Sequence, residues 1–131
     1  MKKLNRKSTK IFNQITAGLN SENPYRKLGE DGETFMPVHV DYLYETEHGT
    51  VYAIAHNYRQ NGDTMADPDM EFLVNKLGIF PMTYQLDGLG IFQRAIEIRD
   101  GRLLYARKLQ NQLKNFANDW MININEQQDL Q

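Results

Sequence analysis

The stretch that decides the fold is HNYRQNGDTMADPDMEF, residues 56–72. Asn61-Gly62 is the strongest short-range turn signal in the chain, because both residues tolerate the positive φ of a two-residue hairpin turn. The residues before it are rich in β-forming side chains, and apolar and polar residues alternate after Pro68. The pattern predicts two antiparallel strands joined across a polar segment at 59–67, with Pro68 limiting where pairing resumes.

Further strands are predicted on both sides of this hairpin from runs in which apolar and polar residues alternate. The connections between them are too short for parallel crossovers, so the sheet should be an antiparallel meander. The predicted strands cover residues 25–28, 35–45, 50–58, 69–75, 82–86, 91–99 and a short return at 102–105.

Two amphipathic helices are predicted at the ends of the chain. Apolar residues recur at helical spacing between Leu4 and Leu19, and either Asn5 or Ser8 could cap this helix. A continuous apolar stripe marks a long C-terminal helix over residues 106–125. Both stripes need an apolar partner, and one face of the sheet is the available one. The sequence therefore predicts an α+β fold: an antiparallel sheet of about five strands, with an N-terminal helix and a long C-terminal helix packed on one face.

The chain of 131 residues is predicted to form a single domain, 1–131. Within it we expect a basic N-terminal helix and linker at 1–22, the antiparallel meander at 25–105 and the C-terminal helix at 106–125. The sequence has no cysteine, which excludes disulfides, thiolate metal sites and cysteine nucleophiles.

Charge is distributed unevenly along the chain, although the net charge is only −2. Residues 1–27 carry seven basic residues and one acidic residue (+6), residues 28–75 carry one and ten (−9), and residues 76–131 carry seven and six (+1). The acidic middle would repel a phosphate backbone, so we expect no nucleic-acid contact except through residues 2–10. No apolar run suits a signal peptide or a membrane span, so a cytoplasmic protein without membrane contact is expected.

The polar hairpin also holds the densest group of candidate site residues, namely His56, Asp63, Asp67, Asp69 and Glu71. Carboxylates of this kind suit a hard cation such as Mg²⁺ or Ca²⁺. A histidine and a carboxylate on one face of paired strands could act as a general acid–base pair. The alternative is that Asp63, Asp67 and Asp69 serve the turn and the loop, while Glu71 faces solvent.

Two narrower hypotheses concern metals and phosphodiesters. His39, His56 and Glu71 could form a metal site if the strands pair as drawn, although single histidines on strands are usually structural. Pro68-Asp69 and Glu71 resemble part of the Pro-Asp…(Asp/Glu)-x-Lys nuclease pattern, but the lysine is missing and Lys76 is out of register. No cofactor is predicted, and a divalent cation is the one ligand that these residues suggest.

Residues 56–72 resemble the signature HYYxQNGDLMxDPxMxF of an uncharacterised bacterial domain family found in Bacteroidetes conjugative-transposon and plasmid gene sets. The resemblance covers residues 34–124 and leaves the basic N-terminal helix outside it. Asn57 stands where that family usually has an aromatic residue. The resemblance supplies no activity, but it implies a bacterial, cytoplasmic protein carried by a mobile element.

Three functions are consistent with these patterns. The first is a non-enzymatic accessory or protein-interaction module, which recruits a protein partner or a second copy through the acidic hairpin or an exposed sheet face. The second is a metal-dependent or acid–base enzyme, such as a hydrolase, that uses the hairpin between His56 and Glu71. The third is nucleic-acid binding through the basic N-terminal helix. The first is favoured, because each candidate site residue also has a simple structural explanation.

Overall fold

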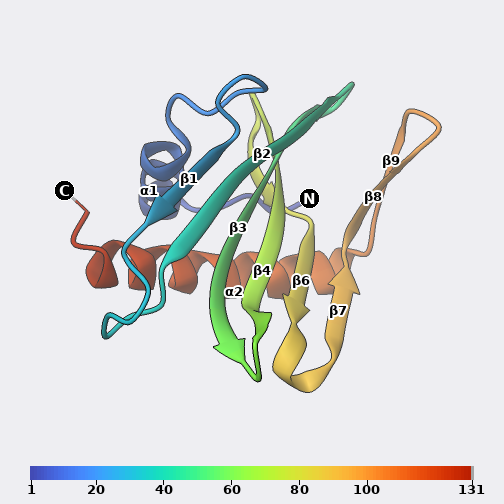
Figure 1. The fold of residues 1–131 in the computed structure, drawn as a ribbon. Helices are drawn as coiled ribbons and strands as arrows, with labels where there is room; N and C mark the ends of the chain where they lie inside the picture. The colour runs from blue at the N-terminus through green and yellow to red at the C-terminus, as the bar shows by residue number, and fades with distance from the viewer. Residues whose placement is uncertain (131) are drawn as a thin grey trace.

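The computed structural model describes residues 1–130. Period-two alternation in the middle of the chain produces strands, and the two apolar stripes at its ends produce helices (Figure 1). In chain order the elements are α1 (Arg6–Thr16), β1 (Tyr25–Leu28), β2 (Val38–Thr46), β3 (Gly49–Gln60), β4 (Asp63–Asn75), β5 (Gly78–Pro81), β6 (Thr83–Leu86), the 3-10 turn η1 (Asp87–Leu89), β7 (Ile91–Arg94), β8 (Ile96–Arg99), β9 (Arg102–Tyr105) and α2 (Arg107–Gln127).

The main sheet is antiparallel, which confirms the predicted α+β class. Its strands follow the order β1-β2-β3-β4-β6-β7, and β5 pairs with the end of β4. Two predictions about the strands were wrong. The strand expected at 91–99 divides at Ala95, whose N–H donates to the carbonyl of Met82, so β8 leaves the sheet and pairs only with β9. Residues 78–81, which lie outside every predicted strand, form β5.

The β3–β4 hairpin is longer than the sequence predicted. Asn61 (φ 53°) and Gly62 (φ 85°) form a tight turn, and Gln60 pairs directly with Asp63. A two-residue turn with positive φ at both positions matches the right-handed twist of the flanking strands. Pairing therefore continues through the segment 59–67 that was expected to be a polar connection. Pro68 does not interrupt β4, since it lies in a bulge after a cis peptide bond.

Both helices lie on one face of the sheet, as predicted, and Figure 1 shows α2 running across the back of the strands. Asn5 is the cap of α1, because its side chain accepts a hydrogen bond from the N–H of Ser8 (2.8 Å). No helix within residues 1–130 is both long and apolar enough to cross a membrane. The core between the helices and the sheet contains Leu4, Ile11, Phe12, Ile15, Leu19, Val38, Val40, Ile54, Met70, Phe72, Ile79, Ala95, Leu113, Ala117, Trp120, Met121 and Ile124.

The opposite face of the sheet is covered only at one end. A second apolar cluster there is formed by Val51, Leu73, Phe80, Met82 and Ile96. Ile96 belongs to β8, so the β8–β9 hairpin covers this end of the face. Towards the other end, polar side chains of β2 and β4 occupy the same face, which we call the open face.

Candidate functional site

The five predicted site residues are distributed over three places in the hairpin. Asp63 lies at the exposed tip, next to the Asn61-Gly62 turn. The guanidinium of Arg59 donates to the carbonyl of Gly62 (3.2 Å) and so stabilises the same turn. The structural explanation of Asp63 as a turn residue therefore fits its position, because Asp63 directly follows the turn and pairs with Gln60.

His56 lies on the helix side of the sheet with 5% of its surface exposed. The indole N–H of Trp120 in α2 donates to its Nδ1 (3.2 Å), so the neutral ring carries its proton on Nε2. Burial lowers the pKa of His56, and the charge of Asp67 raises it to a smaller extent. Nε2 has no hydrogen-bond partner within residues 1–130. His56 is thus a buried, neutral histidine that contacts α2.

Asp67 is the one predicted carboxylate that lies near His56. Ala55 pairs with Asp69 and Asn57 pairs with Ala66, so Asp67 and Pro68 together lie opposite His56. This two-against-one arrangement is a β-bulge, which re-aims the side chain of the extra residue. The negative charge of Asp67 accordingly acts on the His56 ring.

Asp69 and Glu71 lie on the open face, away from His56. Two cross-strand rows define their surroundings: Asp41–Ala53–Glu71 and His39–Ala55–Asp69, each running from β2 through β3 to β4. Since neighbouring strands are about 5 Å apart, the side chains of β2 and β4 flank the two alanine methyls at a separation of roughly 10 Å. We call these six residues the alanine trough.

Burial and neighbouring carboxylates destabilise the charged form of Asp69. Burial and the charges of Glu71, Asp41 and Asp87 raise the pKa of Asp69 to about 6. Burial also raises the pKa of Asp41 and lowers the pKa of His39. The trough therefore concentrates negative charge in a half-buried position, where His39 is mostly neutral and offers little compensation at neutral pH.

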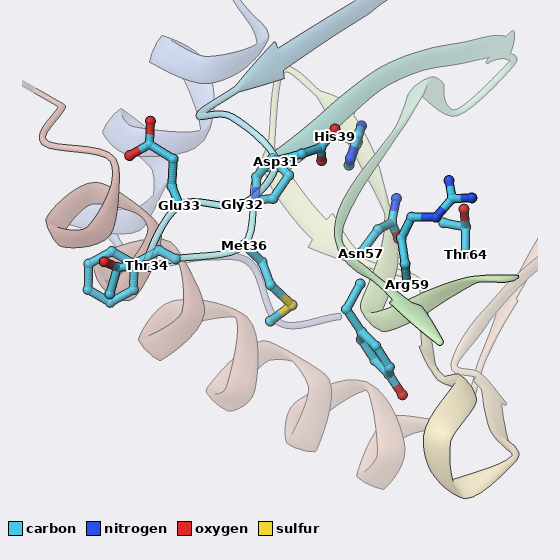
Figure 2. A pocket seen from close by; sticks show the side chains of 12 residues that line it. Asp31, Gly32, Glu33, Thr34, Met36, His39, Asn57, Arg59 and Thr64 are labelled. Carbon is cyan, nitrogen blue, oxygen red and sulfur yellow. The ribbon is translucent and has the colours of Figure 1, made fainter. Parts of the chain in front are cut away.

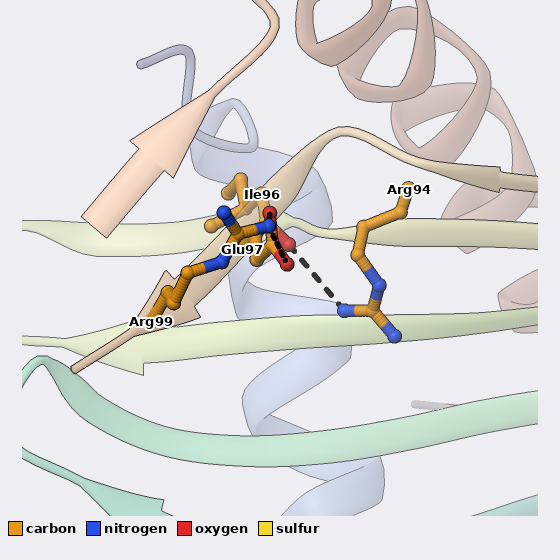
Figure 3. Close-up of polar contacts among 4 residues, drawn as sticks. All are labelled: Arg94, Ile96, Glu97 and Arg99. Atoms are coloured by element: carbon orange, nitrogen blue, oxygen red, sulfur yellow. Dashed lines mark hydrogen bonds and ion pairs between the residues drawn. The ribbon is translucent and has the colours of Figure 1, made fainter. Parts of the chain in front are cut away.

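Two arginines near the open face form hydrogen bonds with residues two positions away in the chain (Figure 3). Arg94 donates to the carbonyl of Ile96 (3.4 Å), and Arg99 donates to both carboxylate oxygens of Glu97 (2.9 and 3.0 Å). In the described part of the chain the ion pairs are Arg99–Glu97 and one between Lys27 and Asp31. No carboxylate of the alanine trough is therefore in an ion pair there.

The predicted metal and acid–base arrangement is not assembled. His56 faces α2, whereas His39 and Glu71 belong to the open face, because alternate residues of a strand point to opposite sides. Within residues 1–130 there is no group of three or more histidine, aspartate or glutamate side chains that could hold a metal ion. The expectation that His56 and Glu71 share a face was wrong, because His56 follows the apolar set of Tyr52 and Ile54.

A cavity of about 500 Å³ lies beside the free end of the hairpin (Figure 2). Figure 2 shows Met36 and Asp31 of the 31–37 loop on one side and Asn57, Arg59 and Thr64 of the hairpin on the other. Sequence reasoning missed this cavity, since the loop carries no strong periodic signal. Only the paired Gly29 and Gly32 turn signals in the sequence indicated that the chain folds back there.

We predict that Asp69→Asn stabilises the protein at neutral pH. A pKa raised from 3.8 to about 6 means that the native state resists ionisation of Asp69, so this group contributes less stability as pH rises through that interval. Asparagine removes the charge, and after allowance for solvent screening the expected gain at pH 7 is about 1–2 kcal/mol. Urea unfolding followed by Trp120 fluorescence measures it.

The gain should shrink as the pH falls from 7 towards 4, where the native carboxyl is protonated. Asp63→Asn at the exposed hairpin tip is the matched control and should change the free energy of unfolding by less than about 0.5 kcal/mol. A gain for Asp69→Asn that does not depend on pH, or a loss of stability, would show that the native state does not resist ionisation of Asp69.

The comparisons with known proteins identify a family but no activity. A family model described as "Domain of unknown function (DUF6908)" matches residues 8–130. The match is longer than the range 34–124 that carried the resemblance, and it includes most of α1. The searches of curated proteins and of solved structures gave no match. The chain therefore belongs to the DUF6908 family of domains of unknown function.

Proposed function

We propose that this chain is a non-enzymatic protein-interaction module that binds a basic segment of a partner protein on the alanine trough. The resemblance of residues 56–72 to the conjugative-transposon family supports a bacterial mobile element as its setting and the cytoplasm as its location. The observation that carries the proposal is the set of carboxylates Asp41, Asp69 and Glu71 on the open face, none of which is in an ion pair within residues 1–130.

The shape of the trough suits a lysine or arginine side chain. Ala53 and Ala55 provide a floor of methyl groups, over which the aliphatic stem of such a side chain would lie. Asp41 on β2 and Asp69 and Glu71 on β4 would then surround its cationic head. A larger residue at position 53 would fill the same space.

The energetics of Asp69 support the same partner chemistry. A half-buried carboxyl with a pKa of about 6 lowers stability at neutral pH, and stability is commonly given up where a residue serves function. A cation held beside Asp69 would lower the pKa of its carboxyl again, so binding near pH 6 would release a proton. Affinity for a basic partner is therefore expected to rise between pH 5 and pH 7.

The other two hypotheses have weaker support. The imidazole of His56 is buried beneath Trp120, which leaves little access for a substrate. The basic residues of the N-terminal segment are exposed, but the acidic segment 28–75 would repel a phosphate backbone. A midpoint of thermal unfolding raised by Mg²⁺, Mn²⁺, Ca²⁺ or Zn²⁺ would favour the metal-dependent enzyme, since a ligand of the native state must stabilise it.

The test is calorimetric titration with a nonapeptide of alternating lysine and valine at low ionic strength. Combined Asp41→Asn, Asp69→Asn and Glu71→Gln substitutions should weaken binding at least about tenfold, because each removes a charged contact. Ala53→Ile should weaken it comparably while keeping every charge. Isoleucine also suits a strand, so the fold should persist.

The matched control neutralises three exposed carboxylates elsewhere, Glu22, Asp119 and Glu126, and changes the net charge by the same amount. It should leave the affinity within about twofold of the unmodified protein. If the control weakens binding as much as the trough variant, attraction is due to net charge alone and the proposal fails.

A further inference from the structure

Strand β3 extends beyond the end of its neighbour β2. The β2–β3 pairing ends at Val38 opposite His56, whereas β3 continues to Gln60 and stays paired with β4 on its other side. Within residues 1–130, no backbone hydrogen bond joins residues 57–60 to the 31–37 loop. Residues 57–60 therefore have one unpaired strand edge, a position where another extended chain can add.

The 500 Å³ cavity lies along this unpaired edge. Its walls are the 31–37 loop on one side and Asn57, Tyr58 and Arg59 of β3 on the other. Phe35 in the loop is 47% exposed, so an apolar side chain stands at the opening. The volume is within the range that binding sites enclose, and the combination of an open edge with side-chain pockets is that of strand-addition sites.

The charge of the walls selects the occupant. The charged side chains that line the cavity are Asp31, Glu33 and Arg59, all from the acidic segment 28–75, and their charges sum to −1. Arg59, the one basic residue of this segment, donates to the carbonyl of Gly62 in its own turn. Glu33 lines the cavity and is in no ion pair within residues 1–130. A cationic segment would be attracted here, and an acidic one repelled.

We propose that residues 57–60 of β3 accept an extended, basic segment of the partner protein as an additional strand. Its backbone would pair with the open edge, and its alternate side chains would reach Phe35 and Met36 or the carboxylate of Glu33. His39 borders both this cavity and the alanine trough, so one segment can contact both. The inference rests on the proposed function, because it assigns the same basic partner a second contact.

The test uses the alternating lysine–valine nonapeptide and two versions of it, N-methylated at either the odd or the even amides. One edge of an added strand is hydrogen-bonded, so one methylated version should bind at least about tenfold more weakly than the parent, through loss of about two hydrogen bonds. The other version should retain most of its affinity. Peptide addition should also slow hydrogen exchange of those amides within residues 57–60 that point away from β4.

Two side-chain variants accompany the peptides. Phe35→Ala should weaken binding several-fold, through loss of an apolar contact at the edge of the cavity. Phe92→Ala is the matched control, because Phe92 is 56% exposed on β7 at the far edge of the sheet. It should leave the affinity unchanged.

The outcomes separate this inference from the proposed function. If both methylated peptides bind as tightly as the parent while neutralising the trough still weakens binding, strand addition is wrong and the proposed function stands. If the parent peptide does not bind, both fail. Slow exchange in the free protein of those amides within residues 57–60 that point away from β4 would also overturn the inference, because this edge would then already be paired by the chain's own loop or by a second copy.

Discussion

Trp120→Ala is expected to lower the free energy of unfolding by about 3–5 kcal/mol, the range for removing a large buried aromatic side chain. Trp120 is 4% exposed and packs edge-on against His56, with the ring centroids 5.5 Å apart. Its removal would open a cavity between α2 and the hairpin. It would also leave Nδ1 of His56 without its donor, in addition to the unpartnered Nε2. Urea unfolding followed by circular dichroism measures the loss.

Trp120→Phe separates volume from hydrogen bonding at the same position. Phenylalanine fills most of the space but has no N–H, so the expected loss is about 1–2 kcal/mol, close to the cost of one unsatisfied buried acceptor. If the alanine variant loses no more than the phenylalanine variant, packing of α2 on the hairpin contributes little and the arrangement around His56 is wrong.

Phe12→Ala is the second large effect, with an expected loss of about 3–5 kcal/mol. Phe12 is fully buried in the interface between α1 and the sheet, and its ring meets Tyr52 and Phe72 edge-on at centroid distances of 5.9 and 5.1 Å. Alanine would remove the main contact that holds α1 on the sheet. Urea unfolding followed by Trp120 fluorescence reports the change.

Two variants serve as controls for Phe12→Ala. Phe12→Leu retains much of the volume and should cost clearly less, about 1–2 kcal/mol. Asn13→Ala changes the next, exposed position of α1 and should stay within about 0.5 kcal/mol of the unmodified protein. A loss below about 1 kcal/mol for Phe12→Ala would mean that α1 is not docked as described.

Much of the fold could be predicted from alternation alone. Val38 and Val40 on β2 and Met70 and Phe72 on β4 are fully buried, as their spacing indicated. This prediction works because side chains of a strand alternate between two faces whatever the partner strand is. The long apolar stripe likewise placed α2, which ends at Gln127, two residues beyond the predicted boundary.

Irregular pairing could not be predicted, because a bulge depends on both strands. A register shift after Tyr42 places Tyr44 opposite Val51, so Tyr44 is 47% exposed on the open face instead of following Tyr42 towards the core. The bulge at Asp67 similarly brings this carboxylate near His56. Neither bulge can be recognised from the alternation of apolar and polar residues within a single strand.

The candidate site was predicted as a set of residues but not as an arrangement. The sequence indicated that Asp69 and Glu71 are on a polar face, and this is where they lie. It could not show that Asp41 approaches them across Ala53, because that depends on the register of three strands. The position of His56 could have been predicted, since it lies two residues after Ile54 and therefore points to the same, buried face.

The most direct test of the proposed interaction is amide chemical-shift mapping by NMR with the alternating lysine–valine nonapeptide. Binding at the alanine trough predicts amide shifts at Asp41, Ala53, Ala55, Asp69 and Glu71, beside those that strand addition would cause within residues 57–60, and it predicts that the shifts at the trough disappear when the three carboxylates are neutralised. Shifts confined to α1 and α2, or shifts that persist after this neutralisation, would contradict it.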